Sequence, residues 1–211
     1  MRLMGLMAVL ALVLGTAGSA SAQDTGAYIA PKAGFTYLMG EIEGDSEGKG
    51  QLLLGLAVGY DFMPNNDYPV RAELEYAWRD KTKLLNESGS YNGINYTGTG
   101  KVGAHSLFLN TYIDLHNETS VTPYIGAGLG AARVSVEADA SINGVPSNLR
   151  ESETNFAWNV GAGAACRVND SVSLDLGYRY SDLGKVKVED LLGAKVKATS
   201  HDVILGLRLD L

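Results

Sequence analysis

The sequence predicts an all-β fold, a single eight-stranded antiparallel up-and-down barrel that spans a membrane. Three observations predict it. Long segments alternate apolar and polar residues with a period of two, the connections between them alternate between short and long, and the polar positions carry arginine and carboxylate side chains in matched numbers. Together they indicate strands that turn one face to lipid and the other to a narrow interior.

The first 22 residues have the order of regions of a secretory signal peptide. Arg2 is followed by a short apolar run, Leu3 to Leu14, and then by small residues that end at Ala22. This run is too short to cross a membrane as a helix, which takes about 20 residues. We therefore expect a signal peptide at 1–22 and an outer-membrane barrel domain at 23–211.

The composition excludes several classes of function. Acidic residues number 24 against 17 basic ones, whereas a nucleic-acid-binding surface needs clustered positive charge. The single cysteine, Cys166, leaves no pair for an internal disulfide, a zinc site or a redox motif. An exported chain without disulfides fits a bacterial envelope.

Alternation with a period of two predicts eight strands. In the segment 172–181, apolar or aromatic residues at even positions alternate with more polar ones at odd positions. Such runs of about 10 residues exceed the 5 to 6 of an ordinary soluble strand and approach the 9 to 11 that cross a bilayer when tilted. The predicted strands are 27–38, 51–62, 70–79, 105–115, 121–136, 155–168, 172–181 and 201–211.

The connections alternate in length. Three are short, and we expect them to be periplasmic turns: 64–69, 116–120 and 169–170. Four are long, and we expect them to be extracellular loops: 41–50, 80–100, 138–153 and 182–200. This is the layout of an outer-membrane barrel with both termini in the periplasm.

The charged residues on the polar face predict a paired interior. Lys32 is the one lysine on that face, and arginine is favoured where a carboxylate must be held bidentately in a confined space. A solvated outer face, as in a soluble lipocalin-like barrel, would use lysine freely, and that barrel is the alternative. The predicted polar network of the lumen comprises Arg71, Glu73, Glu75, Arg79, Asp114, Arg167, Asp175, Arg179, Asp202 and Arg208.

Three segments resemble strands of the small opacity-type and OmpA-like outer-membrane barrels: 123–134, 156–163 and 176–184. The last strand also resembles the assembly signal of that family, with Gly206, Leu209 and Leu211 in place. It departs from the family pattern at Ile204, where a polar residue is usual, and at Leu211, where phenylalanine is usual. The resemblance implies lipid and lipopolysaccharide as surroundings, and the outer-membrane insertion machinery and periplasmic chaperones as assembly partners.

Residues with catalytic or metal-binding potential are few, and we expect no catalytic residue, cofactor or metal site. His105 precedes Ser106, but adjacent strand residues point to opposite faces and cannot form a dyad. His116 and His201 are isolated in the sequence. The acidic segment 41–47 lacks the spacing of an EF-hand, so we interpret it as a solvated loop.

These observations favour a non-catalytic surface or structural protein of the bacterial outer membrane. Adhesion or envelope integrity, acting through the extracellular connections and an unidentified surface ligand, is the leading role. A small-solute channel is the alternative, and a lipid-modifying enzyme is a third hypothesis. Because eight strands leave an interior only wide enough for side chains, we expect a closed lumen.

Overall fold

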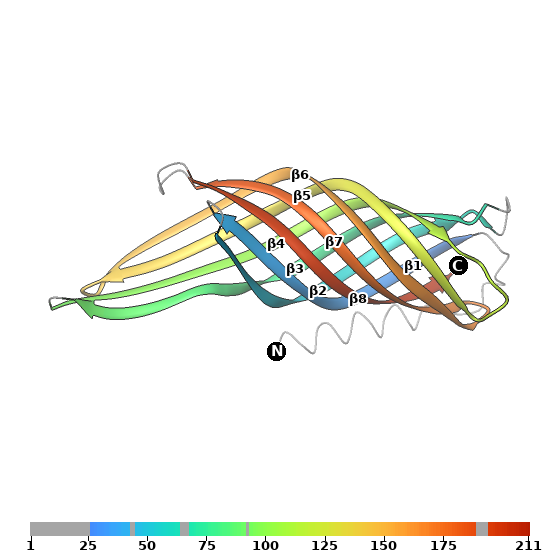
Figure 1. Cartoon of the computed structure of the whole chain (residues 1–211), viewed down its shortest axis with the longest axis horizontal. Helices are drawn as coiled ribbons and strands as arrows, with labels where there is room; N and C mark the ends of the chain where they lie inside the picture. The colour runs from blue at the N-terminus through green and yellow to red at the C-terminus, as the bar shows by residue number, and fades with distance from the viewer. Residues whose placement is uncertain (1–25, 43–44, 64–67, 92, 189–193) are drawn as a thin grey trace.

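The structure, a computed structural model, describes residues 26–42, 45–63, 68–91, 93–188 and 194–211, so the signal peptide expected at 1–22 lies outside the described residues. Eight antiparallel strands pair in chain order, and β1 pairs with β8 to close a barrel (Figure 1). The predicted fold class is confirmed. The strands are β1 (Ala27–Ile42), β2 (Asp45–Asp61), β3 (Val70–Tyr91), β4 (Ile94–Asp114), β5 (Val121–Ile142), β6 (Val145–Asn169), β7 (Val172–Val188) and β8 (Ala194–Asp210).

The outer surface of the barrel is apolar. Phe35 is 73% exposed, and Leu176 and Leu205, which pair across β7 and β8, are 58% and 54% exposed. The alternate positions point inward, where charged side chains such as Glu75 and Asp202 are fully buried. This arrangement is the inverse of a soluble barrel, and it is stable only where lipid covers the outside. In the described part of the chain no helix is suited to crossing a membrane.

The structure corrects the prediction of long loops. β3 and β4 remain paired as far as Tyr91 and Ile94, and β5 and β6 as far as Ile142 and Val145. Most of the segments 80–100 and 138–153 is therefore β-hairpin. The physical reason lies in the turns, because an Asn-Gly pair at 143–144, with φ of 49° and 82°, closes a two-residue hairpin whose twist matches that of the strands.

The connections expected at 41–50 and 182–200 are also largely strand. Pairing of β1 with β2 extends to Ile42 and Asp45, and pairing of β7 with β8 extends to Val188 and Ala194. The short turns gather at the opposite end of the barrel, on the side where the C-terminus lies (Figure 1). The predicted alternation of a short-turn end and a long-hairpin end is therefore confirmed.

Glycines on the inner face of β5 make room for larger side chains. A Cβ atom on Gly128 would collide with the side-chain amide of Asn110, and one on Gly126 with the ring of Tyr112. The same relation holds for Gly163 on β6, whose Cβ would collide with the hydroxyl group of Tyr124. The crowded lumen thus explains part of the high glycine content.

Candidate functional site

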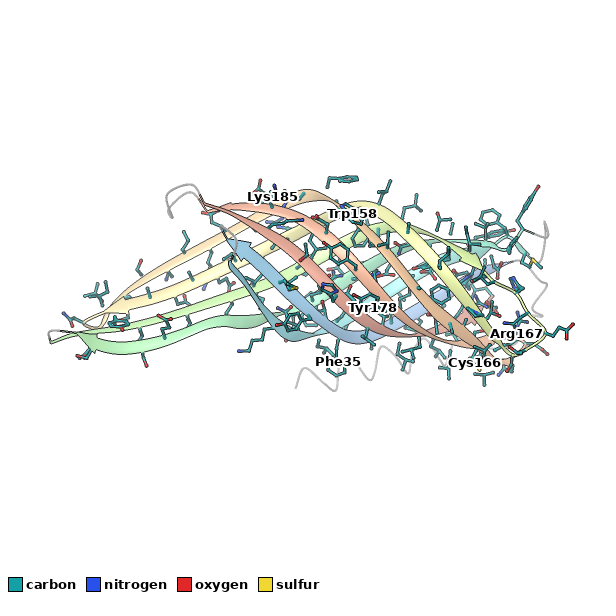
Figure 2. The ribbon with its side chains drawn as sticks, in the orientation of Figure 1. Phe35, Trp158, Cys166, Arg167, Tyr178 and Lys185 are labelled. Atoms are coloured by element: carbon teal, nitrogen blue, oxygen red, sulfur yellow. The ribbon has the colours of Figure 1, made fainter. Side chains whose placement is uncertain are left out.

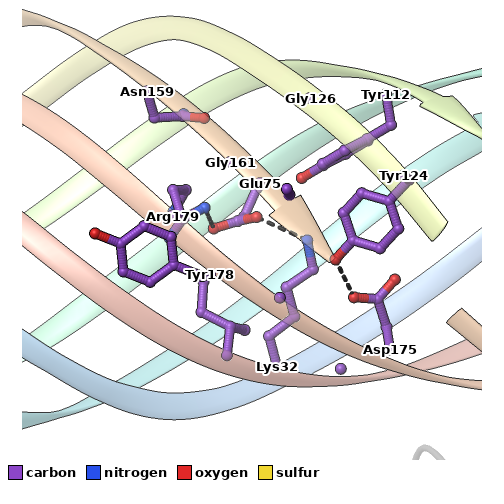
Figure 3. A pocket seen from close by; sticks show the side chains of 14 residues that line it. Lys32, Glu75, Tyr112, Tyr124, Gly126, Asn159, Gly161, Asp175, Tyr178 and Arg179 are labelled. Atoms are coloured by element: carbon purple, nitrogen blue, oxygen red, sulfur yellow. Dashed lines mark hydrogen bonds and ion pairs between the residues drawn. The ribbon is translucent and has the colours of Figure 1, made fainter. Parts of the chain in front are cut away.

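The centre of the lumen is built around Glu75 of β3, which is fully buried. Arg179 Nη1 donates a hydrogen bond to Glu75 Oε1 at 2.6 Å, and Lys32 Nζ donates to Glu75 Oε2 at 2.7 Å (Figure 3). Asn110 Nδ2 adds a longer bond of 3.3 Å to Oε2. Three other strands, β7, β1 and β4, therefore converge on one carboxylate.

A second buried carboxylate, Asp202 of β8, lies between two arginines. Its Oδ2 atom accepts a hydrogen bond from Arg79 Nη2 at 2.7 Å and another from Arg179 Nε at 3.2 Å. Arg79 also donates through Nη1 to Ser106 Oγ at 3.0 Å. Arg179 thus bridges the Glu75 and Asp202 carboxylates, so that the two sites form one network.

The network continues toward the short-turn end through Arg71, which is buried. Its Nε and Nη2 atoms donate to the two carboxylate oxygens of Asp114 at 2.6 and 2.9 Å. The guanidinium lies 5.0 and 5.1 Å from the ring centroids of Tyr112 and Tyr124. Such a bidentate and stacked arginine fixes both partners in one geometry.

Tyrosines connect the remaining acidic groups. Tyr28 donates to Glu73 at 2.9 Å, and Lys32 donates to the other oxygen of Glu73 at 2.5 Å. The hydroxyl group of Tyr124 donates to Asp175 (Figure 3). These tyrosines were not among the predicted site residues, although their position on the inward face of their strands was a signal that could have identified them.

The structure brings nine of the ten predicted network residues into the lumen, where each is buried or half-buried. Arg167 is the exception, because it lies at the mouth of the barrel and does not join the buried network. Arg167 is exposed at the short-turn end of β6 (Figure 2), because it lies two residues before the end of its strand. Arg208 is buried but has weak partners, with Ser173 Oγ at 3.4 Å and Asp210 Oδ1 at 3.6 Å.

Side chains fill the middle of the lumen. A cavity of about 40 Å³ lies there, lined by residues that include Lys32, Glu75 and Tyr112. This space holds a few water molecules at most. The described residues therefore form a packed polar core at this level of the barrel.

The histidines lie outside this network. His105 points outward and shares a 2.6 Å hydrogen bond with the hydroxyl group of Tyr76, and His201 shares one of 2.5 Å with Tyr178. Ser106 points into the lumen toward Arg79, so His105 and Ser106 lie on opposite faces, as alternation predicted. The acidic segment 41–47 includes positions outside the described residues.

The predicted assembly signal lies on β8 and just beyond it. Gly206 pairs with Lys32 of β1 and Asp175 of β7, and Leu209 pairs with Ile29 and Val172. Leu211 is 55% exposed. The role of Gly206, Leu209 and Leu211 in assembly remains a prediction.

At the end of the barrel opposite the short turns, β3 to β6 continue beyond the barrel as a four-stranded sheet, with the hairpin tips far from the short turns (Figure 1). Within the described residues, β2 stops pairing with β3 at Arg79, and β7 stops pairing with β6 at Trp158. The sheet therefore has two strand edges without a neighbouring strand. We call the region formed by 80–91, 94–103, 133–142 and 145–157 the projecting sheet.

The two faces of the projecting sheet differ in chemistry. On the face that continues the lipid-facing side, Lys81 donates to Glu137 at 2.6 Å, and this bond holds the pKa of the Glu137 carboxyl below its usual value. Arg133 and Arg150 are exposed on the same face. The tip of the sheet exposes large apolar side chains instead: Tyr96 (44%), Ile142 (60%) and Val145 (70%).

Comparison with known proteins agrees with this architecture. The profile of the outer membrane protein beta-barrel domain matches residues 7–208. The chain is 31% identical to outer membrane protein PagN of Salmonella typhimurium, over 94% of this chain and 95% of PagN. It is 30% identical to a Rickettsia typhi protein whose name marks it as a proposed adhesin, over 74% of this chain and 72% of that protein.

A solved structure shows the same fold. The attachment invasion locus protein Ail of Yersinia pestis, crystallised with the heparin analogue sucrose octasulfate, superposes with a TM-score of 0.51 at 18% identity, over 87% of this chain and 99% of Ail. The expected outer-membrane location, non-catalytic surface role and resemblance to small outer-membrane barrels are confirmed. The chain belongs to the outer membrane protein beta-barrel domain family.

Proposed function

We propose that this protein is an adhesin that contacts another surface through the tip of its projecting sheet. One observation carries the proposal: the paired strands hold Tyr96, Ile142 and Val145 exposed beyond the barrel, outside the apolar band that lipid covers. Exposed apolar groups in water are characteristic of interaction sites. The adhesin name of the Rickettsia typhi relative supports the same role.

The hairpin backbone gives this tip a defined shape. Asn143 donates its backbone N–H to the carbonyl oxygen of Asn95 at 2.8 Å, and its side-chain oxygen accepts from the backbone N–H of Asn95 at 2.9 Å. The β5–β6 turn is therefore tied to β4. A rigid apolar tip loses little conformational entropy on binding, which favours affinity.

The experiment measures attachment of bacteria that display the protein to cultured cells. The variant Ile142→Thr/Val145→Thr keeps β-branched side chains and removes the apolar surface, and we expect it to lower attachment several-fold. Ser141→Thr, on the other face of the same hairpin, is the matched control. Unchanged attachment by the double variant at equal surface display would overturn the proposal.

A second candidate function is binding of sulfated polysaccharide. Arg133 and Arg150 are exposed on the charged face of the projecting sheet, and Ail was crystallised with a heparin analogue. Competition with soluble heparin distinguishes the two functions. Loss of attachment in heparin and in Arg133→Gln/Arg150→Gln, with the tip variant still active, would favour the polysaccharide.

The lipid-facing surface and the last strand support three further partners. We propose that lipopolysaccharide surrounds the barrel in the outer leaflet, and that the outer-membrane insertion machinery and periplasmic chaperones act through Gly206, Leu209 and Leu211. Leu211→Phe restores the usual aromatic end of the signal. It should speed insertion into outer-membrane vesicles that contain the machinery, and an unchanged rate would contradict this role.

The lumen does not favour a channel. Arg179, Glu75 and Asp202 fill its centre with charges that neutralise one another. Opening a path would separate buried charges from their partners, at a cost of several kcal/mol.

A further inference from the structure

A larger cavity opens at the short-turn end of the barrel. Its volume is about 450 Å³, compared with about 40 Å³ in the middle of the lumen. Small-molecule sites generally fall in a range of roughly 300–1,000 Å³. The ends of β2, β4, β5, β6, β7 and β8 and the turns beside them line this cavity, which we call the periplasmic mouth.

Two arginines lie on one wall of the periplasmic mouth. Arg167 of β6 pairs in register with Ser173 of β7, and Ser173 pairs with Arg208 of β8. All three residues line the cavity. Because neighbouring strands are about 4.8 Å apart, the backbones of Arg167 and Arg208 lie on either side of Ser173, close enough for two long guanidinium side chains to reach one carboxylate.

Arg208 lies 5.4 Å from the centroid of the Tyr28 ring, but the described residues leave it short of hydrogen-bond acceptors. It is 9% exposed, and its one hydrogen bond among the described residues, from Nη2 to Ser173 Oγ, is 3.4 Å long. Its Nε atom is buried without a hydrogen-bond partner there, and Asp210 Oδ1 lies 3.6 Å away. Arg71 of β3, by contrast, makes bidentate bonds of 2.6 and 2.9 Å to Asp114. A guanidinium carries five donors, so Arg208 has unused donors in a cavity wall.

The other walls limit the charge of a ligand. Asp61 and Asp170 also line the periplasmic mouth, whereas the charge of Asp114 is balanced by Arg71. These carboxylates repel a molecule with several negative charges, and they accept hydrogen bonds from an amine. The chemistry matches a ligand with one carboxylate and one amino group.

We propose that the periplasmic mouth binds the carboxylate end of a short peptide between Arg167 and Arg208. Ser173 donates to the same carboxylate, and Asp61 and Asp170 face the amino end. In the predicted topology this cavity opens toward the periplasm, so the ligand reaches it from that side. Inorganic phosphate shares the oxyanion chemistry but lacks the amine.

The experiment is calorimetric titration of the refolded full barrel in detergent micelles, where both ends are open to solvent. The probes are trialanine, its N-acetyl derivative, its C-terminal amide and inorganic phosphate. We expect trialanine to bind saturably, and the amide to bind at least about tenfold more weakly, because the charge-assisted bonds are lost. N-acetylation should weaken binding less than amidation does, and phosphate should bind more weakly than trialanine.

Variants connect the binding to the two arginines. Arg208→Gln and Arg167→Gln should each weaken trialanine binding about tenfold or more. Arg167 is exposed, so its variant keeps the fold even if Arg208→Gln does not. Lys185→Gln, the same charge change at the far end of β7, should leave binding unchanged (Figure 2).

Four results would overturn the proposal. They are the absence of saturable binding by trialanine, equal binding of the acid and the amide, unchanged binding by Arg167→Gln, and phosphate binding as tight as that of trialanine. The last result would identify a simple oxyanion site in place of a peptide site.

Discussion

Arg179 and Glu75, 104 positions apart in the chain, form an ion pair of 2.6 Å in the centre of the barrel. Each has a second partner of opposite charge. Lys32 also binds Glu75, and Asp202 also binds Arg179. Four strands are therefore joined by a single chain of charges. The stability and the permeability of the barrel both depend on this chain.

Removing one member of the ion pair should destabilise the barrel. Arg179→Ala leaves buried carboxylates with fewer partners, and we expect a loss of roughly 3–5 kcal/mol in the free energy of unfolding. Urea titration in lipid vesicles, followed by heat-modifiable mobility on gels, measures it. The exposed Lys185→Ala is the control and should change stability by less than about 0.5 kcal/mol.

A double-mutant cycle separates the ion pair from general damage. Glu75→Ala combined with Arg179→Ala should show a coupling energy of about 0.5–3 kcal/mol, since the two side chains are in contact. Strictly additive losses would contradict a direct interaction in the folded barrel.

The unmodified protein should conduct little. The side chains that fill the lumen leave a central cavity of about 40 Å³, so planar bilayers should show no steady conductance or only rare, small openings. Large, stable, ohmic steps from the purified protein would contradict a closed lumen and favour the channel.

Charge on the lipid-facing surface should be costly in a depth-dependent way. Leu176→Arg or Leu205→Arg, which pair with each other several residues in from the short-turn ends of β7 and β8, should cost about 2–4 kcal/mol in lipid. Val121→Arg, at the end of β5, should cost about 0–1 kcal/mol. Equal effects at all three positions would show that the outward face is misassigned.

The two ends of the barrel should differ in accessibility on whole cells. In a Cys166→Ala background, a membrane-impermeant maleimide should label Ser147→Cys on the projecting sheet. It should not label Asp170→Cys in the short turn between β6 and β7 unless the outer membrane is permeabilised. Labelling of Asp170→Cys on intact cells would invert the topology.

The alternation of residue types by itself determined the barrel, its eight strands, and which face of each strand is apolar and which is polar. A strand turns successive side chains to opposite sides, so Leu176 and Asp175 had to lie on different faces wherever the strand was placed. The same rule separated His105 from Ser106. Turn chemistry was also present in the sequence, since the Asn-Gly pair at 143–144 signals a hairpin inside a segment that we expected to be a loop.

Only the tertiary structure decided which charges meet. Period-two alternation places Glu75, Arg179 and Asp202 on one face but contains no information on the stagger of strands far apart in the sequence. Closure of β1 against β8 sets that stagger, and it brings Arg79 and Asp202 within 2.7 Å although 123 positions separate them. The same stagger leaves Arg167 exposed at the mouth and Arg208 without a full set of partners, because depth along the barrel axis depends on register and not on residue type.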